Sequence, residues 1–129
     1  MPLPLFCSGV SAGFPSPADD FIEAPLDLNE HLIKHPSATF YARAQGDSMT
    51  GLGIFSGDLL VVDRAVQPQH GDVVIAAIDG ELTCKIRDLR EQMLRSGNVK
   101  FPFIKLHDDV DMVVEGVVIH SIRYHRCMR

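Results

Sequence analysis

Long apolar runs are missing from this sequence, and none approaches the ~18 residues that a membrane-spanning helix requires. The segment before Val10 also contains no Lys or Arg, and Pro2 and Pro4 interrupt its short apolar stretch. A secretory signal needs a basic start followed by an unbroken apolar segment, so neither a membrane span nor a secretory leader is predicted. The small residues Val10-Ser11-Ala12 would nevertheless suit the position before a peptidase cut.

The sequence is also short of positive charge and of paired cysteines. It has 12 Lys and Arg against 17 Asp and Glu, a net charge of −5, which argues against direct binding to a DNA duplex. Its three cysteines, Cys7, Cys84 and Cys127, form no C-x-x-C pair, so neither a disulfide framework nor a zinc ribbon is predicted. A reducing cytoplasm is the expected location, and no cofactor is expected. Cys84 could be a reactive thiol or a small buried hydrophobe, and the roles of all three stay open.

What the sequence does contain is the pattern of a mainly β domain. Apolar residues make up 46% and charged residues 22%, as is typical of a globular protein. Asp79-Gly80 predicts a tight hairpin, Gly97-Asn98 a second turn, and Gly116 a β-bulge. Five segments have the alternation or the β-branched content of strands: 39–44, 58–63, 72–78, 81–87 and 111–123.

One short helix is predicted over residues 27–35, capped by Asp27 and ended by Pro36. His31 and His35 lie four apart on this helix, which is a spacing that can hold a metal. No third ligand has supporting spacing, so two solvent-facing histidines and no metal site are expected.

The N-terminal residues 1–19 are typical of an extended arm, because Pro, Ser and Gly recur throughout them. Residues 20–129 are expected to form the folded domain. Apolar side chains such as Phe6 and Phe14 leave two interpretations of the arm. It is either a poorly ordered terminus or a segment that docks on a surface.

Gly46-Asp47-Ser48-Met49 is the first pattern that could carry chemistry. A glycine turn after a strand can expose a serine hydroxyl and aim backbone N–H groups at an oxyanion. The pattern alone is weak, since Gly, Asp and Ser are ordinary turn residues. The serine would need a base, either one of the six histidines or a lysine made neutral by burial. Lys85 is the lysine candidate, although strand alternation places it on the polar face, as a surface lysine.

The order of several blocks resembles UmuD-like members of the LexA-like family of self-cleaving serine peptidases. The blocks run in sequence over most of the chain, with similar gaps. They are residues 13–23, 27–29, 35–39, 46–49, 57–63, 70–77 and 79–85, with 116–120 near the end. Residues 88–112 contain no clear block, and their role is left open.

The resemblance implies a bent β-sheet fold shared with bacterial signal peptidases, and specific site residues. Ser48 matches the nucleophile and Lys85 the general base, and the N–H groups of Ser48 and Met49 are expected to hold the oxyanion. Ala12-Gly13 matches the bond that these peptidases cut in their own chain. The bond in this sequence is Ala-Gly, the LexA-like form, whereas the corresponding bond in UmuD is Cys-Gly. Ala and Cys are both small, so the same chemistry is expected.

The resemblance also implies partners and a role in the SOS response to DNA damage. A RecA filament on single-stranded DNA would stimulate removal of the arm. The trimmed homodimer would then serve a UmuC-like Y-family polymerase in error-prone translesion synthesis. The alternative is a UmuD-like dimeric regulator that binds the polymerase or RecA without cutting itself. A fragment of a LexA-like repressor and a general signal peptidase are less favoured, because no upstream DNA-binding domain and no membrane anchor are expected.

Overall fold

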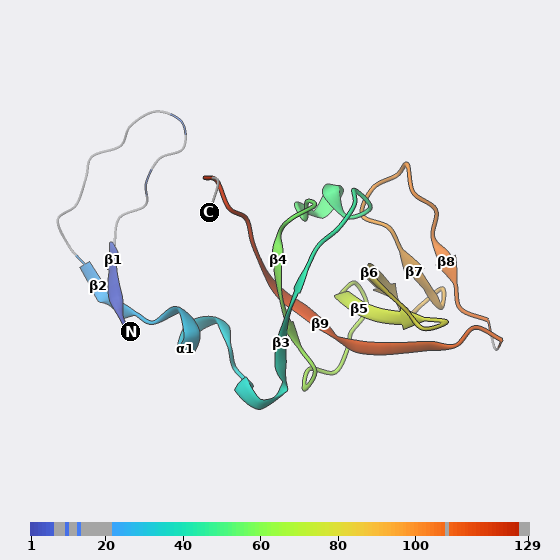
Figure 1. The fold of residues 1–129 in the computed structure, drawn as a ribbon, viewed down its shortest axis with the longest axis horizontal. Coiled ribbons are helices and arrows are strands. Elements are labelled where there is room, and N and C mark those ends of the chain that lie inside the picture. Colours follow the sequence, from blue (N-terminus) through green and yellow to red (C-terminus); the bar gives the residue numbers. More distant parts are fainter. Residues whose placement is uncertain (7–9, 11–12, 14–21, 108, 127–129) are drawn as a thin grey trace. The chain divides into compact units, whose positions relative to one another are not determined.

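The computed structural model describes residues 1–6, 10, 13, 22–107 and 109–126 (Figure 1). Its chain contacts divide it into two compact units, Met1–Lys34 and His35–Arg129. No helix in the described part of the chain is both long and apolar enough to cross a bilayer. Each unit is built from its own strands and is described by itself.

The first unit contains a small two-stranded sheet. Strand β1, Leu3–Phe6, pairs antiparallel with strand β2, Ile22–Leu26. The amino group of Met1 lies 2.8 Å from the Asp27 carboxylate, directly after β2. The described start of the predicted arm is thus extended, as a β-strand. Most of the arm that follows, with Ala12 of the predicted cleavage bond, lies outside the described residues.

The helix α1 covers Leu28–Leu32 and is shorter than the sequence predicted. Asp27 caps it as expected, since its side chain accepts a hydrogen bond from the Asn29 N–H. The predicted end near His35 is wrong, because the chain is already extended at Ile33. The residue before a proline is disfavoured in helical conformation, and His35 precedes Pro36.

His35 consequently lies beyond the helix, and the prediction that it shares a helical face with His31 is wrong. Its ring nitrogen Nδ1 lies 2.6 Å from a carboxylate oxygen of Asp63, which is 1% exposed. Both histidines are nevertheless exposed, as expected of solvent-facing side chains, and the half-exposed ring of His35 also contacts the buried Asp63.

The second unit is one seven-stranded antiparallel sheet with the strand order β3-β4-β9-β5-β6-β7-β8. Together with the short helix, it confirms the predicted mainly β fold. Two single 3-10 turns, Pro36–Ala38 and Thr50–Leu52, accompany the strands. The strand bounds are β3 Thr39–Arg43, β4 Leu59–Asp63, β5 Val73–Ile78, β6 Glu81–Asp88, β7 Met93–Arg95, β8 Ile104–Lys105 and β9 Met112–Ile122.

Strands β5 and β6 form the predicted hairpin at Asp79-Gly80. Both turn residues have positive φ, 49° and 86°, which is the backbone that a type I′ turn requires and that Asp-Gly adopts readily. The tight turn fixes the register, so that Lys85 on β6 stands opposite Val74 on β5. The position of Lys85 in the sheet therefore follows from local turn chemistry.

Strand β9 lies between β4 and β5, and it pairs with β5 along its first half and with β4 along its second (Figure 1). The register shifts at Glu115 in the first pairing and at Ile119 in the second, which are two bulges that increase twist. The first shift lies directly before Gly116, where the sequence predicted it. A Cβ at Gly116 would lie 2.6 Å from a methyl of Val62, so only glycine fits there.

Apolar side chains pack against both faces of the central strands. One cluster includes Ile75 with Leu60, Val62 and Met49, and a second includes Val74 with Leu94 and other residues. Neighbouring residues of β5 thus belong to different clusters, as strand alternation requires. Neither face of this strand is left to solvent at its centre.

Candidate active site

The turn that carries Ser48 follows strand β3 and is held open by Gly46. The φ of Gly46 is +88°, a conformation that favours glycine, and the Gly46 N–H donates to the Ser56 hydroxyl at 3.3 Å. Met49, directly after the serine, is buried in the apolar cluster and its carbonyl accepts from Leu52 and Ile54. The turn is therefore anchored through Met49, while the Ser48 side chain is only half-buried.

Lys85 meets Ser48 across a sequence separation of 37 residues. The Lys85 Nζ lies 2.9 Å from the Ser48 Oγ, a direct hydrogen bond. The alternation-based expectation of a surface lysine is wrong, because Lys85 is half-buried. Its strand neighbour Val74 is fully buried, and Arg87, on the same face by alternation, is only 8% exposed. This face of β6 is covered by other parts of the fold, which a polar pattern cannot reveal.

Burial changes the protonation of two neighbouring residues on β6. It lowers the pKa of Lys85 below its ordinary 10.5, because desolvation disfavours the ammonium form. No carboxylate of the described residues forms an ion pair with Lys85 that would oppose this shift. Burial also raises the pKa of the Cys84 thiol to about 11, and nearby Lys85 offsets this only in part. Burial therefore shifts both groups toward their uncharged forms.

A pocket of about 310 Å³ opens beside the Ser48 hydroxyl. One wall comes from the end of β3 and the loop after it, and the other from the first half of β6. Three strands lie between β3 and β6 in the sheet order, so the sheet curls strongly to bring both walls together. The lining residues are Ala42, Arg43, Ala44, Gln45, Gly46, Ser48, Met49, Ile54, Leu60, Ile75, Leu82, Thr83, Cys84 and Lys85.

Two strand edges border this pocket. β3 is an end strand of the seven-stranded sheet. β6 pairs with β7 only from Ile86 onward, so Glu81–Lys85 has its described partner on one side only, in β5. An unpaired edge can hydrogen-bond an extended peptide as an additional strand. The pocket thus lies beside two strand edges with unpaired backbone groups, and several apolar side chains line it.

The main-chain N–H groups of Ser48 and Met49 are the predicted oxyanion donors. Neither donates a hydrogen bond to an acceptor within the described part of the unit His35–Arg129. A serine hydroxyl, a neutral amine and two such N–H groups are the components of nucleophilic acyl transfer. No three His, Cys, Asp or Glu side chains gather as a metal site in the ranges that the structure describes.

Sequence reasoning missed the segment Ser96–Asn98, which lies within the stretch 88–112 that had no assigned role. The Ser96 hydroxyl donates to the carbonyl of Ser48 at 2.9 Å, and the Asn98 amide donates to the carbonyl of Asp47 at 3.1 Å. The sequence predicted a turn at Gly97-Asn98, and the structure has a bend at these two residues followed directly by a turn. Nothing in the sequence pattern indicated what that bend would contact.

The predicted site residues divide between the two units. Ser48, Met49 and Lys85 come together in the second unit. Gly13 belongs to the first unit, and Ala12 lies outside the described residues. The cleavage bond therefore remains a prediction from the sequence resemblance.

Comparisons with known proteins cover nearly the whole chain. A family model described as Peptidase S24-like matches residues 4–119. Protein ImpA of Salmonella typhimurium is 48% identical over 126 residues, which cover 98% of this chain and 87% of that protein. Protein MucA of Escherichia coli is 41% identical over 130 residues, covering 98% and 89%. The LexA repressor of Psychromonas ingrahamii is 38% identical over 119 residues, covering 88% of this chain and 56% of the repressor. The family match includes Ser48, Lys85 and the segment Ser96–Asn98.

Proposed function

Because this chain belongs to the Peptidase S24-like family, we propose that it is a self-cleaving serine peptidase with Ser48 as nucleophile and Lys85 as base. The family assignment confirms the resemblance predicted from the sequence. The single observation that carries the two roles is the 2.9 Å contact between Lys85 Nζ and Ser48 Oγ. Burial lowers the pKa of that lysine, and a serine nucleophile requires a base of this kind.

The first chemical step forms an acyl enzyme. Neutral Lys85 takes the proton of the Ser48 hydroxyl, and Oγ bonds to the carbonyl carbon of Ala12. The N–H groups of Ser48 and Met49 hold the resulting oxyanion, where one such donor is typically worth ~10²–10³ in rate. The ammonium of Lys85 then gives its proton to the Gly13 nitrogen as the C–N bond breaks, which releases the chain that begins at Gly13.

The second step returns the site to its starting state. Lys85, neutral again, takes a proton from a water molecule as the water oxygen bonds to the acyl carbon. The tetrahedral species collapses, Ser48 leaves with the proton from Lys85, and the segment that ends at Ala12 is released. No cofactor takes part in either step.

The proposed substrate is the N-terminal arm, laid as an extended strand along the edges that border the pocket. The first half of β6 and the edge of β3 support this binding mode, since both can pair with a peptide backbone. The small size of Ala12 suits a substrate position close to the Ser48 hydroxyl. The arm of the same chain and the arm of a second copy would both satisfy this chemistry.

The biological role follows the family resemblance. Cleavage of the arm acts as a switch in the SOS response, stimulated by a RecA filament on single-stranded DNA. The trimmed homodimer then serves as the accessory subunit of an error-prone, UmuC-like translesion polymerase. The whole-chain similarity to proteins ImpA and MucA supports this placement over a repressor, because the LexA match covers only part of the repressor.

Intact mass spectrometry of the full chain tests the activity. Incubation with activated RecA filament, or at alkaline pH alone, should produce a species that begins at Gly13. Ser48→Ala should remain full length under both conditions, with Ser121→Ala, an exposed serine on β9, as the matched control. Cleavage that persists in Ser48→Ala would overturn the nucleophile assignment. A wild-type chain that stays intact under both conditions would favour the non-cleaving dimeric regulator.

A further inference from the structure

Side chains of the segment Ser96–Asn98 donate hydrogen bonds to the main-chain carbonyls of Asp47 and Ser48. The Ser96 hydroxyl donates to the Ser48 carbonyl at 2.9 Å. The Asn98 side-chain amide donates to the Asp47 carbonyl and to the Thr50 hydroxyl oxygen, both at 3.1 Å. The Thr50 hydroxyl in turn donates to the Asp47 carbonyl at 3.1 Å. Both peptide groups that flank the nucleophile are therefore fixed through their oxygens.

Fixing a carbonyl also fixes the N–H of the same peptide group. A peptide bond is planar and trans, so its oxygen and its hydrogen point in opposite directions. The Asp47 carbonyl shares a plane with the Ser48 N–H, and the Ser48 carbonyl shares one with the Met49 N–H. Hydrogen bonds from Asn98 and Ser96 thus direct these two N–H groups away from the segment Ser96–Asn98.

The two segments touch backbone to backbone, which leaves little freedom for the turn to move. A Cβ at Gly51 would lie 1.9 Å from the Gly97 carbonyl oxygen. A Cβ at Gly97 would lie 3.1 Å from the Met49 Cα. Only glycine at position 51 permits this approach, and a side chain at position 97 would be tightly packed, so the contact depends on the sequence of both segments.

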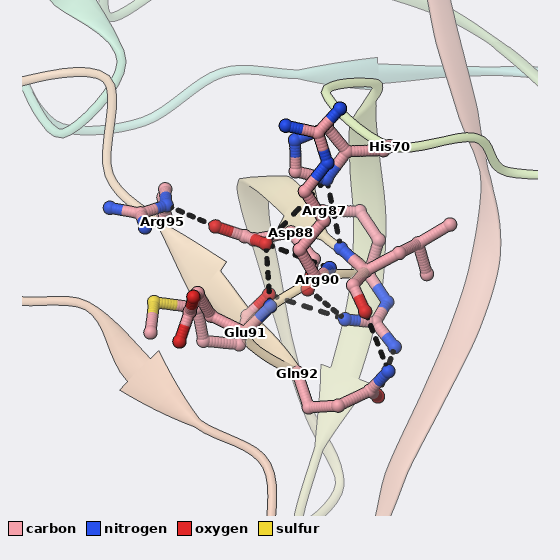
Figure 2. A network of polar contacts seen from close by, with 9 residues as sticks. His70, Arg87, Asp88, Arg90, Glu91, Gln92 and Arg95 are labelled. Carbon is pink, nitrogen blue, oxygen red and sulfur yellow. Dashed lines mark hydrogen bonds and ion pairs between the residues drawn. The ribbon is translucent and has the colours of Figure 1, made fainter.

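The supporting segment is itself fixed to the strand that carries Lys85. Ser96 follows β7, which pairs with β6 in the register Ile86 opposite Arg95. Figure 2 shows the Asp88 carboxylate between these strands, where it accepts from Arg95 Nε and from the N–H groups of Arg90 and Glu91. Lys85 on β6 and Ser96 directly after β7 therefore belong to one strand pair, which the hydrogen bonds of Asp88 hold together.

We propose that Ser96 and Asn98 are positioning residues, which orient the Met49 and Ser48 N–H groups as oxyanion donors by holding the Ser48 and Asp47 carbonyls. This inference rests on the proposed function and adds residues from the stretch 88–112. It assigns the oxyanion geometry to side chains that contact neither the substrate nor the reacting atoms.

The test separates orientation from mere support through the pH profile of self-cleavage in the full chain. Removing an orienting bond should lower the plateau rate at alkaline pH, because the oxyanion is stabilised less well. It should leave the midpoint pH unchanged, because that midpoint reports Lys85. Ser96→Ala and Asn98→Ala should each lower the plateau about tenfold, less than the ~10²–10³ for complete loss of an oxyanion donor.

Conservative and matched variants complete the design. Ser96→Thr keeps the hydroxyl and should stay within about threefold of the wild-type plateau rate. A change of this size corresponds to no more than the net free energy of one ordinary hydrogen bond. Ser121→Ala and Gln67→Ala, both at exposed positions, should cleave like the wild type. Thermal melts set the assay temperature at which every variant is folded.

The outcomes point to different failures. Wild-type plateaus in both Ser96→Ala and Asn98→Ala would overturn the inference while leaving the proposed function intact. Equal losses in Ser96→Thr and Ser96→Ala, or a shifted midpoint, would also overturn it, since the hydroxyl would not be the cause. A wild-type chain without Ser48-dependent cleavage would overturn the proposed function, and this inference with it.

Discussion

Two charged residues three positions apart on β6 meet opposite surroundings. Asp88 is buried among donors, and its pKa is lowered to about 2, first by the Glu91 N–H and then by Arg95. Lys85 is half-buried, its described side-chain partner is the uncharged Ser48 hydroxyl, and burial lowers its pKa. The surroundings thus favour the charged form of Asp88 and the neutral form of Lys85.

The difference shows how one strand can serve both stability and chemistry. A fully hydrogen-bonded carboxylate fixes the β6–β7 pair and contributes to folding only while it is ionised. A lysine without a counter-ion has no partner that stabilises its charged form, and in the proposed function it acts as a base. Each half of this comparison can be tested by changing one residue or the pH.

Replacing Lys85 by Arg should have the largest effect. Arginine keeps the positive charge but does not lose its proton in proteins, so it cannot act as a base. Self-cleavage measured by intact mass should fall by about 10³-fold or more. Lys105→Arg, an exposed lysine on β8, is the control and should cleave normally. A Lys85→Arg chain within tenfold of the wild-type rate would refute the role of the lysine.

Cys84 should be nearly inert to alkylation at neutral pH. Its pKa of about 11 leaves very little thiolate, so iodoacetamide near pH 8 should react ~100-fold more slowly than with an unhindered cysteine. Mass mapping of the peptide that contains Cys84 measures the labelling, and a short cysteine peptide serves as reference. Rapid labelling near pH 8 would mean that the neighbourhood of Lys85 is less buried than described.

The pH dependence of cleavage should report the lowered pKa of Lys85. Below that pKa the neutral fraction rises about tenfold per pH unit, so log rate should rise with unit slope. Because the folded pKa lies below 10.5, the rate should level off before that pH. Between the two values the unfolded chain binds more protons, so rising pH also stabilises the fold. A flat profile, or a rise that continues past pH 10.5, would contradict the assignment.

Asp88→Asn should have the smallest effect on cleavage and a clear one on folding. The folded pKa of about 2 lies below the ordinary 3.8, so the stabilisation is present above about pH 4 and is lost as pH falls toward 2. The variant should melt at a lower Tm at neutral pH, with a shallower further loss in acid. Asp111→Asn, at an exposed position, is the control. An unchanged Tm, or a shifted cleavage midpoint, would remove the contrast with Lys85.

Local features of the fold were predictable, and features set by distant contacts were not. Asp79-Gly80 specified its own hairpin because both residues accept positive φ. Asp27 specified the start of α1 because capping involves only the next few residues. The end of α1 was predicted too late. Pro36 restricts the backbone of His35 only, whereas the chain is already extended at Ile33.

The candidate site was predictable only through resemblance. Residue patterns alone predicted a turn serine at Ser48 and a surface lysine at Lys85. Strand alternation assigns Lys85 to the polar face of β6, but it does not show that other parts of the fold partly bury that face. The contact from Ser96 to Ser48 spans 48 residues and leaves no periodicity in the sequence. Such contacts depend on how the sheet curls at β9. The two bulges increase the twist of this strand, and Gly116 allows its close approach to Val62.

The Asp79-Gly80 hairpin also has a consequence for the order of assembly during synthesis. A hairpin with a two-residue turn forms within microseconds of the strands becoming available, so β6 and Lys85 are set early. The pairings of β9 with β4 and β5 join residues far apart in the chain, and such pairings close late. We therefore expect the proposed peptidase site to be completed only after β9 has left the ribosome, so that the nascent arm is spared until the domain is whole.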